Sequence, residues 1–255
     1  MKSISLYVDR DSILHRIDPV NKMIYILAAI ALPILVPNWY MALICMLCSL
    51  FLLWIGKVFQ KSLPVYGFVF LILITVILIQ GLFHPSNETP LFSLGLVTYY
   101  REGFLFALLI TFRVINIVGS FLILVLTTKP SNLVESLVRR GLSPRFGYVL
   151  VSVFQIVPQM MSTMKRITDA QRSRGMETEG SLSVRVKAFL PLIGPVVLSS
   201  LIHVKERAMA LEVRGFNAKG EKTFLHEEKA YVATRPIQWG LWIMMVAAAV
   251  WRIFL

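Results

Sequence analysis

The chain has 255 residues, of which 56% are hydrophobic and 16% charged, and its formal net charge at pH 7 is +12. This composition is too apolar for an ordinary soluble domain and is typical of a membrane protein. Basic residues alternate with long apolar segments, which fits the preference of inward-facing loops for Lys and Arg better than it fits nucleic-acid binding. We therefore expect a lipid bilayer, and no nucleic acid, as a partner.

The first apolar run predicts two helices. From Met23 to Gly56 there is no charged residue, and Pro37 and Asn38 interrupt the run near its middle. Asp18 can cap the N-terminus of the first helix, and Pro19 suits its first position. The sequence therefore predicts two membrane-spanning helices joined by a tight turn.

Two further spans are predicted at residues 62–82 and 103–128, each long enough to cross a bilayer. The connection between them, 84–102, is the least basic loop and is expected on the outer side. The connections between successive spans alternate between the two sides of the membrane. With the third connection outside, the N-terminus is expected inside.

Arg113 is the charged residue that interrupts the fourth predicted span. A charge at the centre of a spanning helix costs about 2.5 to 3.5 kcal/mol on insertion scales. One interpretation makes Arg113 part of a gate or of a contact with a partner subunit. The other pairs it structurally with Asn116, Gln80 or backbone carbonyls, and the sequence leaves both open.

Two apolar segments of the second half, 146–161 and 188–204, have basic residues on both flanks. A single crossing by either would leave a basic block outside, against the positive-inside preference. We therefore expect both to lie along the inner interface as long amphipathic helices, with Pro158 kinking the first and Pro191 near the start of the second. Residues 237–255 predict a final span.

These segments predict an all-α polytopic membrane protein with about five transmembrane helices and long cytoplasmic coupling helices. We divide the chain into a membrane bundle of about four spans at 1–128, a cytoplasmic or interfacial coupling-helix domain at 129–235, and a C-terminal transmembrane helix at 236–255. The middle part holds 17 Lys and Arg against 9 Asp and Glu, so it is expected to face one compartment, the cytoplasm.

One short phrase occurs twice, about forty residues apart. The copies, 170–176 and 210–216, share Ala, Arg, Gly and an apolar residue at the same spacing. Gly just beyond a helix is the favoured left-handed stop, and Arg near it suits the negative end of the helix dipole. Each copy alone is only a well-made helix end, but two copies on two basic helices predict that Arg174 and Arg214 insert into acidic grooves of a cytoplasmic protein.

No pattern predicts catalysis or a metal site. The spans carry no mid-membrane Asp or Glu, and the His residues are scattered singly. Cys45 and Cys48 lie in an uncharged apolar run, which is typical of buried packing. A near-match to a phosphate-binding loop after Gly215 is interrupted by Glu221. We expect a non-catalytic chain with no metal or cofactor of its own.

Together, these features resemble the transmembrane T component of energy-coupling factor (ECF) transporters, the CbiQ-like family. The resemblance covers nearly the whole chain. It rests on Leu14-His15-Arg16-Ile17-Asp18-Pro19 with Lys22, on the Arg113 span running into Thr127-Thr128 and Pro130, on Pro158 and Pro191-Leu192, and on the two Arg-Gly phrases.

The resemblance implies a non-catalytic scaffold subunit of an ECF-type importer in a bacterial or archaeal cell membrane. Two ATP-binding cassette ATPase subunits would bind ATP, and a separate membrane subunit would capture a vitamin, a vitamin precursor or a transition-metal ion. The phrases would dock in the ATPases through Ala170, Arg174, Gly175, Ala210, Arg214 and Gly215.

The alternative is a self-sufficient secondary transporter or channel. Such proteins usually carry their repeats among the spanning segments and polar groups at mid-membrane. Here the repeat lies outside the predicted spans.

Overall fold

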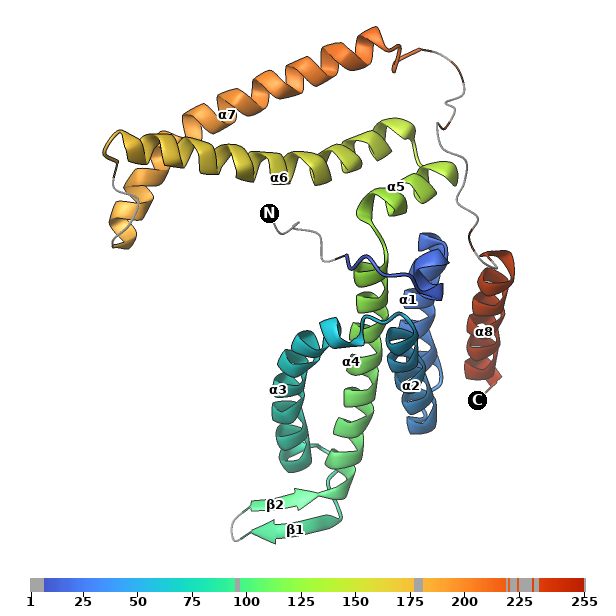
Figure 1. The fold of residues 1–255 in the computed structure, drawn as a ribbon. Helices are drawn as coiled ribbons and strands as arrows, with labels where there is room; N and C mark the ends of the chain where they lie inside the picture. Colours follow the sequence, from blue (N-terminus) through green and yellow to red (C-terminus); the bar gives the residue numbers. More distant parts are fainter. Residues whose placement is uncertain are drawn as a thin grey trace. The chain divides into compact units, whose positions relative to one another are not determined.

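The computed structural model of the protein describes residues 7–94, 97–176, 181–218, 220, 224, 231 and 234–254. Helices form nearly all of the regular structure (Figure 1), which confirms the predicted all-α class. In chain order the elements are the 3₁₀ helix η1 (Ile13–Arg16), α1 (Pro19–Leu35), α2 (Trp39–Ile55), α3 (Phe59–Phe83), β1 (Pro90–Leu94), β2 (Val97–Tyr100), α4 (Arg101–Thr127), α5 (Pro130–Arg139), α6 (Pro144–Ser173), α7 (Leu182–Val213) and α8 (Thr234–Phe254).

The chain divides into two compact units. The bundle unit comprises Ser5–Leu137 and Lys229–Leu255, and therefore holds α1 to α4 and α8. The arm unit is built on Val138–Glu228 and holds α6 and α7. The three-part division at residues 128 and 235 remains a prediction.

Four helices of the described residues are long and apolar enough to cross a membrane: α3, α4, α6 and α8. The helices α1 and α2 have 17 residues each. At 1.5 Å per residue each is about 26 Å long, near the thickness of the hydrocarbon core. The five predicted spans thus correspond to α1 to α4 and α8, while α6, expected at the interface, also meets the length and composition of a span.

The helices α1 and α2 each begin at a capping side chain. The Asp18 carboxylate accepts a hydrogen bond from the backbone N–H of Val20 at 3.1 Å, and Pro19 is the first residue of α1. The Asn38 side chain accepts one from the N–H of Tyr40 at 3.2 Å, so Asn38 caps α2. The predicted cap at Asp18 is confirmed, and Asn38, predicted as part of the turn, also serves as an N-cap.

In the bundle unit α4 contacts α1, α2 and α3, and α8 contacts α1. Helix α4 approaches α2 and α3 closely where it carries a small residue, Gly119. A Cβ added to Gly119 of α4 would lie 2.6 Å from the hydroxyl oxygen of Tyr66 and 3.0 Å from that of Ser49. Small residues allow membrane helices to pack closely where no hydrophobic effect drives them together. The α1 and α8 pair meets in an apolar cluster of Ala28, Leu32 and Ala248.

Two local predictions need correction. The loop predicted at 84–102 contains two antiparallel strands, in which the rings of Phe92 and Tyr99 stack with centroids 5.3 Å apart. Cys48 is exposed and Cys45 is only partly buried, because α2 turns an apolar face outward.

Two hydrogen bonds from α4 to α1 compensate for two prolines. In an α-helix the carbonyl of Ala29 would accept from the N–H of residue 33 and the carbonyl of Pro33 from that of residue 37, but both donors are prolines. Asn116 Nδ2 donates to the Ala29 oxygen at 2.7 Å. Arg113 Nη2 donates to the Pro33 oxygen at 2.7 Å. Of the two interpretations of Arg113, the structure shows the contact with a backbone carbonyl.

Restoring the missing N–H should make Asn116 less important. In the unmodified background, Asn116→Ala leaves the Ala29 carbonyl unpaired and should lower the free energy of unfolding by about 1 kcal/mol. In a Pro33→Ala background residue 33 donates to that carbonyl, so the same change should be less destabilising. Unfolding in mixed detergent micelles measures the difference as a double-mutant cycle, in which the lost side-chain volume cancels. Pro64→Ala in α3 is the matched control, and equal losses in the Pro33→Ala and unmodified backgrounds would refute the compensation.

Candidate functional site

The two repeated phrases end the two long helices of the arm unit. Helix α6 ends at Ser173 with Arg174 as its C-cap, and α7 ends at Val213 with Arg214 as its C-cap. We call residues 170–176 the first box and 210–216 the second box. The glycine after each arginine has a positive φ, 87° in the first box and 68° in the second, which confirms the predicted left-handed stops.

The backbone hydrogen bonds of the two boxes are the same. In each, the N–H of the apolar residue after the glycine donates to a carbonyl five residues earlier, Met176 to Gln171 at 3.1 Å and Phe216 to Leu211 at 3.0 Å. The glycine N–H donates to the carbonyl three residues earlier at 2.9 Å in both boxes. This pair of bonds defines the Schellman motif. The sequence repeat is therefore a structural repeat.

Each box presents an arginine that its own helix does not bury. Arg174 and Arg214 are exposed, and so are Ala170 and Ala210 one turn earlier. Residues four apart share a helix face, so the small alanine side chain leaves room beside the guanidinium for a partner. Val213, next to Arg214, is 89% exposed. An exposed guanidinium beside small and apolar surface is chemistry suited to binding another protein.

The second box is braced by the start of α6. The ring of Phe216 contacts the ring of Tyr148, with centroids 5.4 Å apart. Tyr148 lies in the second turn of α6, so the end of α7 lies beside the beginning of α6 within the arm unit. A pair of aromatic rings at this distance contributes about 0.5 to 1.5 kcal/mol beyond the area it buries.

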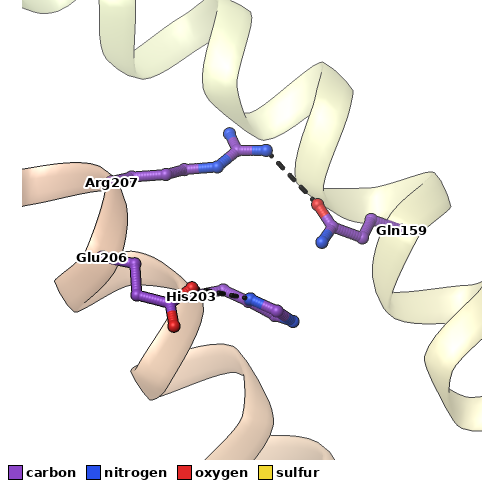
Figure 2. Close-up of polar contacts among 4 residues, drawn as sticks. All are labelled: Gln159, His203, Glu206 and Arg207. Carbon is purple, nitrogen blue, oxygen red and sulfur yellow. Dashed lines mark hydrogen bonds and ion pairs between the residues drawn. The ribbon is translucent and has the colours of Figure 1, made fainter. Parts of the chain in front are cut away.

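The two arm helices are also joined by a polar contact partway along them (Figure 2). Arg207 Nη2 of α7 donates to Gln159 Oε1 of α6 at 3.3 Å. His203 Nδ1 lies 3.4 Å from Glu206 Oε2 within α7. Pro158 immediately precedes Gln159, and it lies inside α6 as predicted. A small cavity beside the contact is lined by Ile156, Gln159, Met160, Thr163, Ser199, Ser200, His203, Val204 and Arg207.

The remaining candidates fall in both units. Pro191 lies inside α7 in the arm unit. Asp18 and Pro19 start α1, and Arg113 lies in α4, all in the bundle unit. The roles assigned to these residues remain predictions. Among the described residues, no group of three or more His, Cys, Asp and Glu side chains is placed to hold a metal ion.

Two buried polar side chains in the first turn of α1 were not predicted as functional residues. Asn21 is 1% exposed and Lys22 is 4% exposed. Lys22 was included in the matched motif without a role. The position of Lys22 next to the uncharged run was a feature that could have indicated this, because a lysine there must either reach water or be paired.

The helix stops can be tested by adding a methyl group. Gly175→Ala and Gly215→Ala have open space around the new Cβ but place it at positive φ, which costs about 1 to 2 kcal/mol. Amides of the last turn of α6 or α7 should then exchange with deuterium at least about fivefold faster. Gly194→Ala, inside α7 and also unobstructed, is the matched control and should slow exchange or leave it unchanged. Unaltered exchange in both box variants would show that the motif does not hold the helix ends.

Comparison with known proteins identifies the family of the chain. The family model described as "Cobalt transport protein" (CbiQ) matches residues 10–224. The chain is similar to proteins named energy-coupling factor transporter transmembrane protein EcfT. That of Lactococcus lactis subsp. cremoris is 29% identical over 96% of each chain, that of Listeria innocua 32% over 86% of each, and that of Lacticaseibacillus paracasei 31% over 85% of this chain and 86% of the other. The chain therefore belongs to the CbiQ family of ECF-transporter T components, as its sequence motifs indicated.

Proposed function

We propose that this chain is the transmembrane scaffold subunit of an ECF-type importer, coupling ATP hydrolysis by two ATPase subunits to uptake through a separate substrate-capture subunit. The observation that carries the proposal is the pair of identical helix ends, Arg174-Gly175 and Arg214-Gly215. They occur in a chain whose relatives are named transmembrane proteins of ECF transporters.

Two equal motifs suit two equal or closely related partners. Subunits related by two-fold symmetry present the same surface twice. A single asymmetric chain that binds both subunits therefore needs the same binding motif at two places, and the two boxes supply it. A guanidinium can form two parallel hydrogen bonds with a carboxylate, and the Schellman motif holds each arginine at the end of a rigid helix.

Coupling follows from the stiffness of the arms. In the proposed cycle the ATPase subunits bind ATP and close, and their closure displaces the two boxes. The helices α6 and α7 are joined at Gln159 and Arg207 and again at Tyr148 and Phe216, so they move together as one lever. The chain itself needs no cofactor or catalytic group in this cycle, because its partners hydrolyse the ATP.

The proposed location is a bacterial or archaeal cell membrane with the arm unit in the cytoplasm. The basic residues of 129–235 support this side because Lys and Arg are retained inside. The capture subunit takes a vitamin, a vitamin precursor or a transition-metal ion in this proposal.

Removal of both box arginines should abolish binding of the ATPase subunits. Truncating one partner of a buried charge-assisted contact costs about 2 to 5 kcal/mol, so Arg174→Ala together with Arg214→Ala should weaken association by far more than tenfold. Each single variant should lose a smaller part. Copurification in mild detergent, after coexpression with the ATPase subunits encoded in the same genome, measures the loss.

The matched control is Lys165→Ala with Lys205→Ala, which removes the same charge from exposed positions of α6 and α7 outside the boxes. It should leave association nearly unchanged. Arg174→Lys with Arg214→Lys keeps the charge without the planar fork and should give an intermediate loss. Equal binding by the double alanine variant and the unmodified chain would exclude the docking role.

A further inference from the structure

Among the described residues, two stretches of chain connect the helices of the bundle unit with the arm unit. One follows α4 through Thr127 and Thr128 into α5, where the bundle unit ends at Leu137, and the other returns after Glu228 and enters α8 at Thr234. Any displacement transmitted along the chain from the arm unit must pass these two points. How firmly each is held therefore decides how much of that displacement the bundle unit receives.

Both points are held by neighbouring residues in the first turn of α1. Lys22 Nζ donates to Thr127 Oγ1 and Thr128 Oγ1, each at 2.9 Å, and to the Thr127 carbonyl at 3.2 Å. Asn21 Nδ2 donates to the Thr234 carbonyl at 2.8 Å. One helical turn thus binds the exit from α4 and the start of α8.

The lysine contact is built for a buried charge. Lys22 is 4% exposed, and an ammonium removed from water must be paired. Its three acceptors match its three N–H donors. The Thr127 carbonyl lies at the C-terminal end of α4, where the helix dipole favours a cation. Asp18, itself 1% exposed, lies one turn before Lys22 on the same helix, and an opposite charge four residues away favours the ammonium further.

The segment before α1 adds a second connection to the same end of α4. The N–H of Val8 donates to the Leu126 carbonyl at 3.0 Å. The Val8 carbonyl in turn lies 2.9 Å from His15 Nε2 in η1. The C-terminal end of α4 is therefore tied to α1 by the Lys22 side chain and to the preceding segment by the backbone.

We propose that Asn21 and Lys22 are positioning residues of a clasp, formed with Thr127, Thr128 and Thr234, that transmits displacement of the arm unit into the bundle unit. The inference rests on the proposed function, since it needs ATPase subunits that move the arms. Without the clasp, the end of α4 and the start of α8 can shift while α1 stays in place. With it, α1, α4 and α8 move together.

The test uses the complete complex of chain, ATPase subunits and capture subunit in lipid nanodiscs. Deuterium uptake is measured by mass spectrometry without nucleotide and with ATP plus orthovanadate. In the unmodified complex, peptides of both units should change their uptake with nucleotide. Lys22→Met, which keeps the length of the side chain and removes its donors, should retain the change in α6 and α7. The change in α1 and α4 should fall at least about twofold. Asn21→Ala should have the same effect on α1 and α8.

A second pair of variants separates the clasp from simple structural support. Thr128→Ser keeps the hydroxyl that accepts from Lys22 and should behave as the unmodified chain, whereas Thr128→Val removes one of the three acceptors at nearly constant shape and should lose part of the response that Lys22→Met loses. If Lys22→Met does not fold, the Thr128 pair decides. Identical responses of the Ser and Val variants would overturn the clasp, and so would a nucleotide response that falls equally in both units. The proposed function fails by a different result, an unmodified chain that binds no ATPase subunit.

Discussion

Inside a bilayer every backbone carbonyl must find a donor within the protein, and this requirement explains the polar residues of the bundle unit. Pro33 and Pro37 remove two N–H groups from the end of α1 and the turn after it. The two carbonyls they leave are taken by Asn116 and Arg113, both from α4. The same logic holds at the C-terminal end of α4, where Lys22 donates to the Thr127 carbonyl. Helix α4 is thus fixed against α1 near its middle and at its C-terminal end by side chains that replace missing backbone donors.

This arrangement gives the bundle unit a property that apolar packing alone does not supply. Apolar contacts between membrane helices compete with equally apolar lipid, so they resist sliding poorly. A donor aimed at one particular carbonyl fixes the register, because a shift by one residue leaves a polar group unpaired in hydrocarbon. A bundle that receives displacement from outside needs such fixed points if the displacement is to reach its far end.

The sequence predicted features that depend on neighbouring residues. The helix start at Asp18, the turn at Pro37 and Asn38, and the helix stops at Gly175 and Gly215 follow from residues within one turn, and all four were predicted. The partner of Arg113 could not be chosen from the sequence, because Pro33 is 80 residues away in the chain. The contact of Lys22 with Thr127 spans 105 residues and was missed for the same reason. The strands β1 and β2 were not predicted because polar residues surround them in the sequence. The aromatic residues Phe92 and Tyr99, whose rings stack across the pair, were the feature that indicated strands.

Half-buried Arg113 and the exposed arginines of the boxes lie near carbonyls with different needs for a donor. Near Arg113 the carbonyls have no backbone donor, so the guanidinium is used within the chain. At the boxes the Schellman hydrogen bonds already supply backbone donors to the last carbonyls of α6 and α7. Capping therefore does not require Arg174 or Arg214, and glycine alone would end each helix. An arginine present at both ends without a role in capping, and exposed at both, is chemistry suited to binding another molecule.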